Sequence, residues 1–452
     1  MPIPAILIFD VGKTNKKVLL FDERYKLLHE ESIQLEEIID EDGFPCEDVN
    51  ALTNWMRQKL FEILSRKDVE IKAVNFSAYG ASFVHIDKSG NVVGPLYNYL
   101  KPYPENLKKQ FYDSYGGEDE IARETASPVL GSLNSGMQLY RLKYEKPEVY
   151  NKINYSLHLP QYLSFILSKN PTTDISSVGC HTNLWDFTKN RYHNWVSKEG
   201  LDKKFAPLYN GDKIIGSTNG QHAITVGIGL HDSSAALIPY LSSFNEPFAL
   251  ISTGTWCISL NPFNHTALTD DELRQDCLCY LSYQGNPVKA SRLFAGHEHE
   301  QQVKRLAAHF EKTTEYFQTV DWDTTFFNAV KDLNEYKRSF LKIDLSEFHS
   351  YEEAYHHLIW NIVVKQVRST NLVLKGTLAR KIFVDGGFGK NKVYMTMLAN
   401  GFPGFEVYTA NVPQASALGA GLAIHKSWNK NPLPADVIQL KRFTNPQINY
   451  SS

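Results

Sequence analysis

The sequence predicts an α/β protein of two domains that face each other across a cleft. Its 452 residues are too many for one hydrophobic core, so two domains of roughly 200 to 240 residues are expected. Each half opens with the same pattern, at residues 5–22 and 249–260: an apolar strand, a turn of glycine and hydroxyl residues, and a second apolar strand. We place the boundary after residue 243, which gives the domains 1–243 and 244–452.

The first hairpin predicts a phosphate cradle. Residues 5–10 form an apolar strand that ends at Asp10, and a turn joins it to a second strand at residues 17–22. Backbone N–H groups and lysines in such a turn can hold phosphate oxygens, although a plain hairpin with solvated lysines has the same pattern. Asp10 is also a candidate Mg²⁺ ligand, through water. The candidate turn residues are Gly12, Lys13, Thr14, Asn15, Lys16 and Lys17.

A second candidate ligand-binding loop follows the strand predicted at residues 72–77. The loop at residues 78–82 contains Gly80, and glycine-containing loops at strand ends commonly contact ligands. The aromatic cluster at residues 97–103 suits the mixed surface of a sugar, although surface packing also explains it. The remaining elements expected here are helices over residues 134–142 and 157–167, and a hydroxyl-rich loop or helix start over residues 174–183.

A strand-to-helix junction lies almost at the midpoint of the chain. Residues 224–230 are apolar and punctuated by glycine, which predicts a buried strand. Small residues at 233–236 can open a helix with Asp232 or Ser233 near its N-cap. Open α/β sheets bind ligands at such junctions, so Asp232 is either a helix cap or a functional carboxylate.

The second half repeats the strand, turn and strand pattern, and then adds a glycine-rich turn. Residues 380–391 predict a strand, a turn and a helix start, where backbone can approach a ligand closely. A small-residue helix follows at residues 414–423. His297 and His299 suggest a metal site, but positions two apart on a helix point about 200° apart and cannot share one ion.

Composition excludes several classes of function. The formal net charge is −3, and no stretch interleaves basic and aromatic residues, so nucleic-acid binding is not expected. No apolar run is as long as a membrane span, and the N-terminal one is too short for a secretory signal. The five scattered cysteines argue against a disulfide framework. We therefore expect a cytoplasmic monomer or homodimer with no nucleic-acid or membrane partner.

Taken together, the motifs resemble the FGGY family of carbohydrate kinases. That family has the actin-like (ribonuclease H-like, sugar kinase/Hsp70/actin) fold, and the resemblance covers nearly the whole chain in the family's order. The matching segments are residues 10–17 and 252–256 (phosphate motifs), 231–233 (catalytic segment), 386–391 (adenosine loop) and 415–419 (the following helix). Residues 134–139, 160–162 and 252–256 are most similar to the rhamnulokinase and fuculokinase branch.

The resemblance implies ATP-dependent phosphorylation, with Mg²⁺, of a hydroxyl on a small ketose such as L-rhamnulose or L-fuculose. It makes Asp232 the general base and places Mg²⁺ near Asp10 and Asp232. The implied ATP-binding residues are Asp10, Gly12, Lys13, Thr14, Asn15, Lys17, Gly254, Thr255, Gly386, Gly387 and Asn391. The candidate sugar-binding residues are Gly80, Ser82, His231, Ser233 and Arg292.

The sugar-contacting positions depart from the family pattern. Ser82 stands where the family's sugar loop usually carries Asp, and Gln161 replaces the Asp of a Pro-Asp-aromatic motif. Gln414 replaces a common Glu, and Arg292 stands where rhamnulokinase has Asn. These changes leave open a catalytically weakened regulator that binds sugar or nucleotide. An actin-like or Hsp70-like ATPase has the same paired hairpins, but the continuous sugar-kinase resemblance argues against it.

Overall fold

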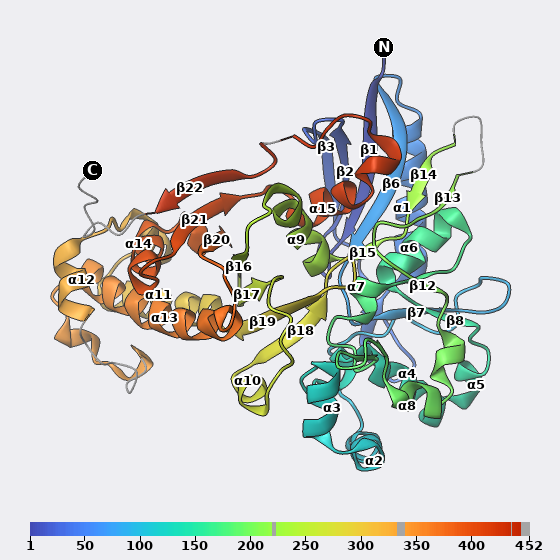
Figure 1. Cartoon of the computed structure of the whole chain (residues 1–452), viewed down its shortest axis with the longest axis horizontal. Helices are drawn as coiled ribbons and strands as arrows, with labels where there is room; N and C mark the ends of the chain where they lie inside the picture. The colour runs from blue at the N-terminus through green and yellow to red at the C-terminus, as the bar shows by residue number, and fades with distance from the viewer. Residues whose placement is uncertain (219–222, 332–339, 435, 444–452) are drawn as a thin grey trace.

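The computed structural model describes residues 1–218, 223–331, 340–434 and 436–443, and it consists of two mixed β-sheets flanked by helices (Figure 1). The strands of the first sheet, in spatial order, are β13 (Ile214–Ser217), β14 (Thr225–Gly227), β6 (Val69–Ala78), β1 (Ile3–Val11), β2 (Lys16–Asp22) and β3 (Leu27–Ile33), and β15 (Leu230–His231) also pairs with β6. The strands of the second sheet are β18 (Cys277–Leu281), β19 (Pro287–Leu293), β17 (Cys257–Asn261), β16 (Phe248–Thr253), β20 (Lys381–Gly386), β21 (Glu406–Asn411) and β22 (Gln439–Phe443).

The two sheets share one topology. In the first, β1 pairs antiparallel with β2 and parallel with β6, and in the second β16 pairs antiparallel with β17 and parallel with β20. Each sheet continues with a third antiparallel strand beyond its hairpin, β3 in the first and β19 in the second. The predicted two-domain α/β organisation, with one strand–turn–strand hairpin opening each half, is confirmed.

Helices and short strands surround these sheets. The helices of the first half are α1 (Val49–Leu64), α2 (Glu105–Tyr115), α3 (Glu118–Thr125), α4 (Ser135–Glu145), α5 (Pro147–Tyr150), α6 (Leu159–Ser168), α7 (Ile175–Val178), α8 (Asn194–Lys198) and α9 (Asp232–Ser243). Those of the second half are α10 (Asp270–Arg274), α11 (Ala295–His309), α12 (Thr324–Val330), α13 (Tyr351–Leu374), α14 (Lys392–Gly401), α15 (Ala415–Ala423) and α16 (His425–Trp428). The short strands are β4 (Glu37–Ile39), β5 (Pro45–Glu47), β7 (Phe83–Ile86), β8 (Tyr155–His158), β9 (Thr173–Asp174), β10 (Trp185–Asp186), β11 (Arg191–Tyr192) and β12 (Leu208–Tyr209).

Two helices, α9 and α15, lie at the centre between the two sheets (Figure 1). One side of α9 packs with α15 and the first sheet, through Ala235 and Ile238. Its other side packs with the second sheet, through Leu237 and Tyr240. α15 comes from the far end of the chain, yet it contacts the first sheet directly. The backbone carbonyl of Ala420 in α15 accepts a hydrogen bond from Nδ2 of the buried Asn75 in β6 (2.7 Å). We propose that the domains divide after residue 243, where α9 ends.

Two local predictions were partly wrong. The strand expected over residues 224–230 is interrupted between β14 and β15, because Gly229 turns with φ +82° and leaves no room for a β-carbon beside the Pro160 carbonyl. The helix expected from Leu157 begins only at Leu159, since the preceding residues form β8. An apolar run alone cannot separate a buried strand from a buried helix.

Within the described ranges, no helix combines the length and the apolar character that crossing a membrane requires.

Candidate active site

Asp232 is the first residue of α9, directly after the N-cap residue His231. Its Oδ1 accepts hydrogen bonds from the Ser233 backbone N–H (2.5 Å) and hydroxyl (3.2 Å). About a third of the Asp232 side chain is exposed to solvent. The protein atoms around the carboxylate still exclude enough water to raise its pKa to about 6. Asp232 therefore combines a fixed orientation with solvent access and an elevated proton affinity.

Asp10 lies near the C-terminal end of β1 and forms a carboxylate pair with Asp232. Burial raises the pKa of Asp10 to about 6, a hydrogen bond from the Ser416 hydroxyl (2.9 Å) opposes that rise, and the negative charge of Asp232 adds to it. Two carboxylates whose charges repel each other suit a divalent cation, although the nearby Lys17 lowers the pKa of Asp10 slightly. The residues present thus fit the Mg²⁺ site that the sequence predicts.

The loop after β6 lies against His231. A β-carbon placed on Gly80 would lie 2.7 Å from the Nε2 and Cδ2 atoms of the His231 ring, so the ring packs directly on the Gly80 backbone. The same ring has its Nε2 3.4 Å from Asp232 Oδ1. The next residue of the loop, Ala81, has φ +62°, and its carbonyl oxygen accepts a hydrogen bond from Gln138 Nε2 (2.6 Å). The structure therefore brings Gly80, His231 and Asp232 together.

Ser82 and Arg292 are held by other contacts. Ser82 is buried, and its hydroxyl lies 3.4 Å from the carbonyl oxygen of Tyr97. The guanidinium of Arg292, on β19, donates from two nitrogens to Asp276 Oδ1 at 3.2 and 2.5 Å and lies over the Trp256 ring. A sugar-binding role for either side chain stays a prediction.

The turn between β1 and β2 is closed by a hydrogen bond from Gly12 N–H to the Asn15 carbonyl (2.9 Å). The Gly12 N–H is therefore already used, whereas Thr14 and Asn15 are exposed at the tip. The lysines of this turn are paired: Lys13 Nζ lies 2.5 Å from Glu37, and Lys17 Nζ donates to Gln414 at 2.8 Å. Lys16 is buried in an ion pair with Glu47 (3.0 Å).

The turn between β16 and β17 is joined to the glycine-rich turn after β20 by Thr253. Its hydroxyl donates to the Asp385 carbonyl and accepts from Phe388 N–H (3.0 Å), and its carbonyl accepts from Gly387 N–H (3.1 Å). Gly386 has φ +79°, and a β-carbon there would lie 1.9 Å from the Thr253 carbonyl oxygen. The turn between β16 and β17 and the glycine-rich turn after β20 are thus joined into one unit, which we call the Thr253 unit.

A cavity of about 580 Å³ opens beside this unit. Three predicted nucleotide-binding residues line it: Gly254, Gly387 and Asn391. The other lining residues are Gly296, His299, Phe317, Gln318, Val320, Asp321, Phe388, Lys390 and Lys392. A volume of this size, with a mixture of apolar and polar walls, can hold a nucleoside.

The wall of this cavity contains a hydrogen-bond network that the sequence did not reveal. Tyr355 Oη, from α13, accepts from Asn391 Nδ2 (2.6 Å) and bonds His299 Nε2 (3.0 Å). His299 also packs edge-on against Phe317 and Phe388, whereas His297 stacks on Phe294. The two histidines therefore contact different partners, as expected of positions two apart on a helix.

The candidate site also contains Thr253, Tyr355 and Ser416, which the sequence analysis did not single out, and His299, which it considered only as a metal ligand. Thr253 and Ser416 lie inside the motifs at residues 252–256 and 415–419, so their hydroxyls were a usable signal. Tyr355 lies in the middle of a long helix, where no local pattern separates it from a core residue.

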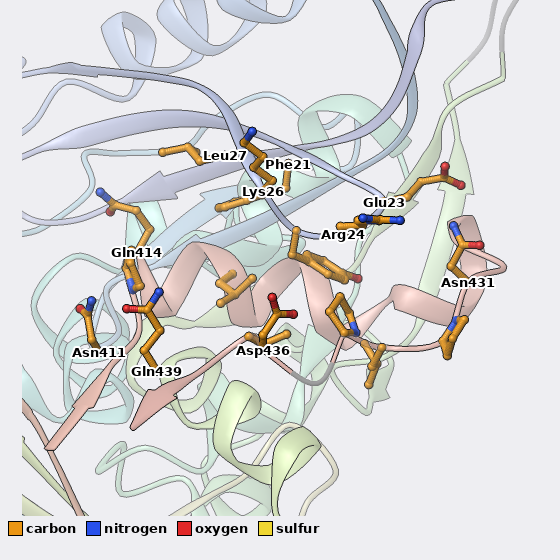
Figure 2. A pocket seen from close by; sticks show the side chains of 17 residues that line it. Phe21, Glu23, Arg24, Lys26, Leu27, Asn411, Gln414, Asn431, Asp436 and Gln439 are labelled. Carbon is orange, nitrogen blue, oxygen red and sulfur yellow. The ribbon is translucent and has the colours of Figure 1, made fainter. Parts of the chain in front are cut away.

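A second, larger cavity of about 870 Å³ lies between the β2–β3 turn and the segment after β21 (Figure 2). It contains none of the predicted site residues. One of its lining residues, Gln414, accepts the hydrogen bond from Lys17 and has left-handed backbone geometry with φ +52°. The cavity is thereby connected to the first phosphate turn through a single side chain.

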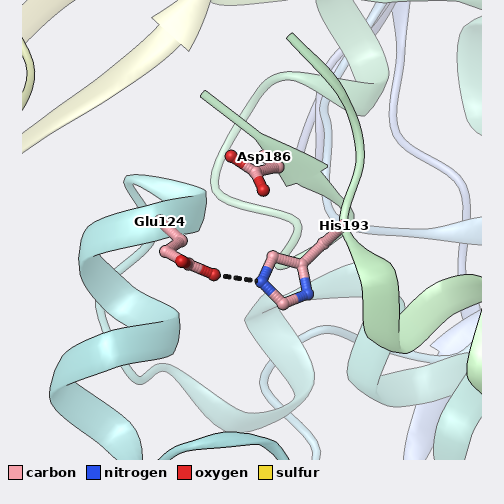
Figure 3. Close-up of side chains that lie close together, drawn as sticks. All are labelled: Glu124, Asp186 and His193. Atoms are coloured by element: carbon pink, nitrogen blue, oxygen red, sulfur yellow. Dashed lines mark hydrogen bonds and ion pairs between the residues drawn. The ribbon is translucent and has the colours of Figure 1, made fainter. Parts of the chain in front are cut away.

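Glu124, Asp186 and His193 also lie close together (Figure 3). His193 Nε2 is 2.6 Å from Glu124 Oε2, and Lys189 Nζ is 2.8 Å from Asp186 Oδ2 and 3.7 Å from a Glu124 oxygen. The ammonium group of Lys189 already supplies the positive charge that these carboxylates need. We interpret the cluster as a structural ion-pair network around the start of α8.

Comparison with known proteins identifies the family of this chain. The sequence model of the FGGY family of carbohydrate kinases, N-terminal domain, matches residues 5–238, and that of the carbohydrate kinase FGGY C-terminal domain matches residues 245–326. A rhamnulokinase of Klebsiella pneumoniae (strain 342) is 25% identical over 283 residues. That alignment covers 58% of this chain and 56% of the relative, so the chain spans about half the length of the curated relatives it matches.

Solved structures establish the same fold over almost the entire chain. A carbohydrate kinase from Novosphingobium aromaticivorans superposes with a TM-score of 0.80 at 22% identity, covering 98% of this chain and 97% of that one. A xylulose kinase from Lactobacillus acidophilus superposes with a TM-score of 0.78 at 16% identity, covering 98% and 94%. The fold is the two-domain actin-like fold of these kinases. Because the N-terminal match alone spans more than half of the chain, this protein belongs to the FGGY family of carbohydrate kinases.

Proposed function

We propose that this protein is an ATP-dependent carbohydrate kinase that phosphorylates a hydroxyl of a small ketose such as L-rhamnulose or L-fuculose. The observation that carries the proposal is the pair of carboxylates, Asp10 near the end of β1 and Asp232 at the start of α9, beside the His231 ring that packs on the Gly80 loop. Family membership supports the reaction class, and the 25% identity to rhamnulokinase supports the ketose.

In the proposed reaction, Asp232 accepts the proton of the sugar hydroxyl as that oxygen bonds to the γ-phosphorus of ATP. The bond from the γ-phosphorus to the bridging oxygen breaks, and ADP leaves with the electron pair. A carboxylate whose pKa lies near 6 is ionised at neutral pH and can take a proton released late in a loose transition state.

The turns hold the phosphates. Because the N–H groups of Gly12 and Gly254 close their own turns, the remaining N–H groups of the two turns and the Thr14 and Thr255 hydroxyls would face the β- and γ-phosphates. Mg²⁺ held by Asp10 and Asp232 supplies charge neutralisation of the phosphate oxygens when bound. The adenosine occupies the cavity lined by Gly387 and Asn391.

A catalytically weakened sugar- or nucleotide-binding regulator is the second candidate. It is favoured by the sugar loop, where Ser82 replaces the family's Asp and makes its contact inside the protein. A cytoplasmic location fits either function, because all five cysteines are buried and free.

The experiment that separates the two functions is a coupled assay of ADP release with Mg-ATP. The acceptors tested are L-rhamnulose, L-fuculose, ribulose, xylulose and glycerol. The kinase proposal expects sugar-dependent ADP release with at least one acceptor. ADP release that no acceptor raises above the sugar-free rate, in a protein that still binds ATP, would contradict it and favour the regulator.

A further inference from the structure

Asp174 is the N-cap residue of α7, and its side chain is completely buried. Its Oδ2 accepts a hydrogen bond from the Ser177 backbone N–H (2.9 Å), which caps the helix in the usual way. The same oxygen also accepts from two hydroxyls, those of Ser176 and of Ser177 (3.3 Å). These two hydroxyls are additional to the cap, so the carboxylate holds two serine side chains as well as the helix end.

Ser176 contacts the segment that carries the proposed general base. Its Oγ accepts a hydrogen bond from the His231 backbone N–H (3.2 Å). A serine hydroxyl has one proton and two lone pairs, and because the proton points to Asp174, a lone pair is left for His231. Asp174 therefore sets the orientation in which Ser176 accepts from the residue that immediately precedes Asp232.

Ser177 provides an internal comparison. It is as deeply buried as Ser176, and its hydroxyl donates to the same oxygen of Asp174. Among the residues that the structure describes, however, the Ser177 hydroxyl makes no hydrogen bond to β15 or α9. The two serines thus share the support of α7, and only Ser176 extends that support to His231.

The start of α9 is also held from the second half of the chain. The Ser234 hydroxyl donates to the Leu281 carbonyl (3.0 Å), and the Leu281 N–H donates to the carbonyl of Gly179, directly after α7 (3.1 Å). A β-carbon on Gly179 would lie 2.4 Å from Leu281 Cγ, so the two segments are in close contact. The contacts at His231 and Ser234 therefore hold the chain on both sides of Asp232.

A displacement of the His231 backbone would disturb the candidate active site. The His231 ring packs on Gly80, its Nε2 lies 3.4 Å from Asp232 Oδ1, and the peptide bond joins the two residues. Without the Ser176 hydroxyl, the buried His231 N–H would have to find another partner. A general base must lie within hydrogen-bond reach of the proton that it accepts, and a misplacement of about 1 Å can lower a rate by about 100-fold.

We infer that Ser176, oriented by Asp174, is a positioning residue that holds the His231 backbone and thereby fixes the Asp232 carboxylate for proton transfer. The inference rests on the proposed function for the role of Asp232. It adds to that function two buried residues that act through His231 and not on a substrate.

The test compares Ser176→Ala with the matched control Ser177→Ala. Each substitution removes one buried hydroxyl and one donor to Asp174, but only Ser176→Ala removes the acceptor of the His231 N–H. The values of kcat and KM are measured by ADP release with Mg-ATP and the acceptor that the wild type uses fastest among L-rhamnulose, L-fuculose, ribulose, xylulose and glycerol. Thermal midpoints and deuterium uptake by the peptide spanning residues 230–234 are measured on the same proteins without substrate.

We expect Ser176→Ala to lower kcat by about tenfold or more, with the KM for ATP within about twofold of the wild-type value. Deuterium uptake at residues 230–234 should become about threefold faster or more, because the His231 N–H has lost its partner. Ser177→Ala should keep kcat within about twofold and exchange like the wild type, even where its thermal midpoint falls. Should Ser176→Ala not fold, Ser176→Cys replaces it, since a thiol fills the space but accepts hydrogen bonds poorly.

Equal kcat values in the Ser176 and Ser177 variants overturn the inference, because the loss of kcat would then follow from α7 as a whole. Unchanged deuterium uptake in the Ser176 variant overturns it as well. A wild-type protein that releases no ADP with any acceptor contradicts the kinase proposal alone, since the exchange measurement then decides whether Ser176 holds His231.

Discussion

Gly419 and Ala235 bring the backbones of α15 and α9 into contact: a β-carbon on Gly419 would lie 1.8 Å from the Ala235 carbonyl oxygen. The contact matters for the site because each helix carries one of its groups. α9 begins with Asp232, and Ser416 in the first turn of α15 donates its hydrogen bond to Asp10. The crossing of the two helices therefore sets the position of one carboxylate relative to the other.

We expect Gly419→Ala to destabilise the protein by about 1–3 kcal/mol, because the added methyl group must push the two helices apart. Gly421→Ala is the matched control on the same helix. Its β-carbon would lie 3.3 Å from the Tyr25 ring and make ordinary contacts with Ile6 and Ile8 at 3.8 Å, and alanine is otherwise the better helix former. Urea denaturation measures both, and a Gly421 variant that is the less stable of the two would contradict the packing argument.

We expect Asp232→Asn to lower kcat by about 10²–10⁴-fold, because an amide cannot accept the proton of the sugar hydroxyl. Binding of ATP should be retained, since Asn391, Gly387 and the rest of the nucleoside cavity are unchanged. The control Asp271→Asn alters an exposed carboxylate of α10 and should keep full activity. Steady-state ADP release and nucleotide binding are measured in parallel, and full activity in Asp232→Asn would exclude the general-base role.

We expect Gly80→Ala to raise the KM for sugar at least tenfold with little change in the KM for ATP. The new methyl group would meet the His231 ring at 2.7 Å and displace it from its place beside Asp232. Gly216→Ala, in β13, is the control, because its β-carbon would make an ordinary contact with Ser168 at 3.6 Å. Initial-rate kinetics with each substrate varied in turn distinguishes this outcome from a general loss of folded protein.

We expect Tyr355→Phe to raise the KM for ATP by about fivefold to tenfold, since Asn391 and His299 would both lose the hydroxyl that they share. Tyr351→Phe is a close control one helical turn away. The Tyr351 hydroxyl is buried without a partner among the described residues, so its removal should not weaken the protein or nucleotide binding. Equal effects of the two substitutions would show that the network does not support the nucleotide site.

We expect stability to fall as the pH decreases below the ordinary histidine pKa. Burial lowers the pKa of His85 to about 3, from 6.5, so in this window the unfolded chain binds a proton that the folded protein does not. His85→Asn should reduce the slope of the unfolding free energy between about pH 4 and 6 by about 1.4 kcal/mol per pH unit. The exposed His349→Asn is the control, and a slope that His85→Asn leaves unchanged contradicts the assignment.

The parts of the site that follow one another in the chain were predictable. The hairpins at residues 5–22 and 249–260 and the turn at residues 386–391 are local patterns, in which strand periodicity and turn residues specify the backbone directly. Asp232 was identified because a strand-to-helix junction places a carboxylate in a crevice wherever the strand lies in the sheet.

The parts that depend on distant segments were not predictable. Tyr355 reaches Asn391 because α13 packs against α14, and nothing in the sequence around either residue encodes that contact. Ser416 reaches Asp10 across the length of the chain for a similar reason. The hydroxyl-rich segment at residues 174–183 indicated only a polar surface, because its contact with the start of α4, from Asn134 Nδ2 to the His181 carbonyl, depends on a distant segment.

The position of α9 between the two sheets has a consequence for turnover. Since α9 packs on both sheets, the α9–α15 crossing would be the hinge axis of a rotation that moves one sheet relative to the other. Points near an axis move little, whereas the Thr253 unit with its nucleotide cavity moves with the second sheet. Each opening would then separate the nucleotide from the sugar, while the positions of Asp10 and Asp232 relative to each other would stay the same.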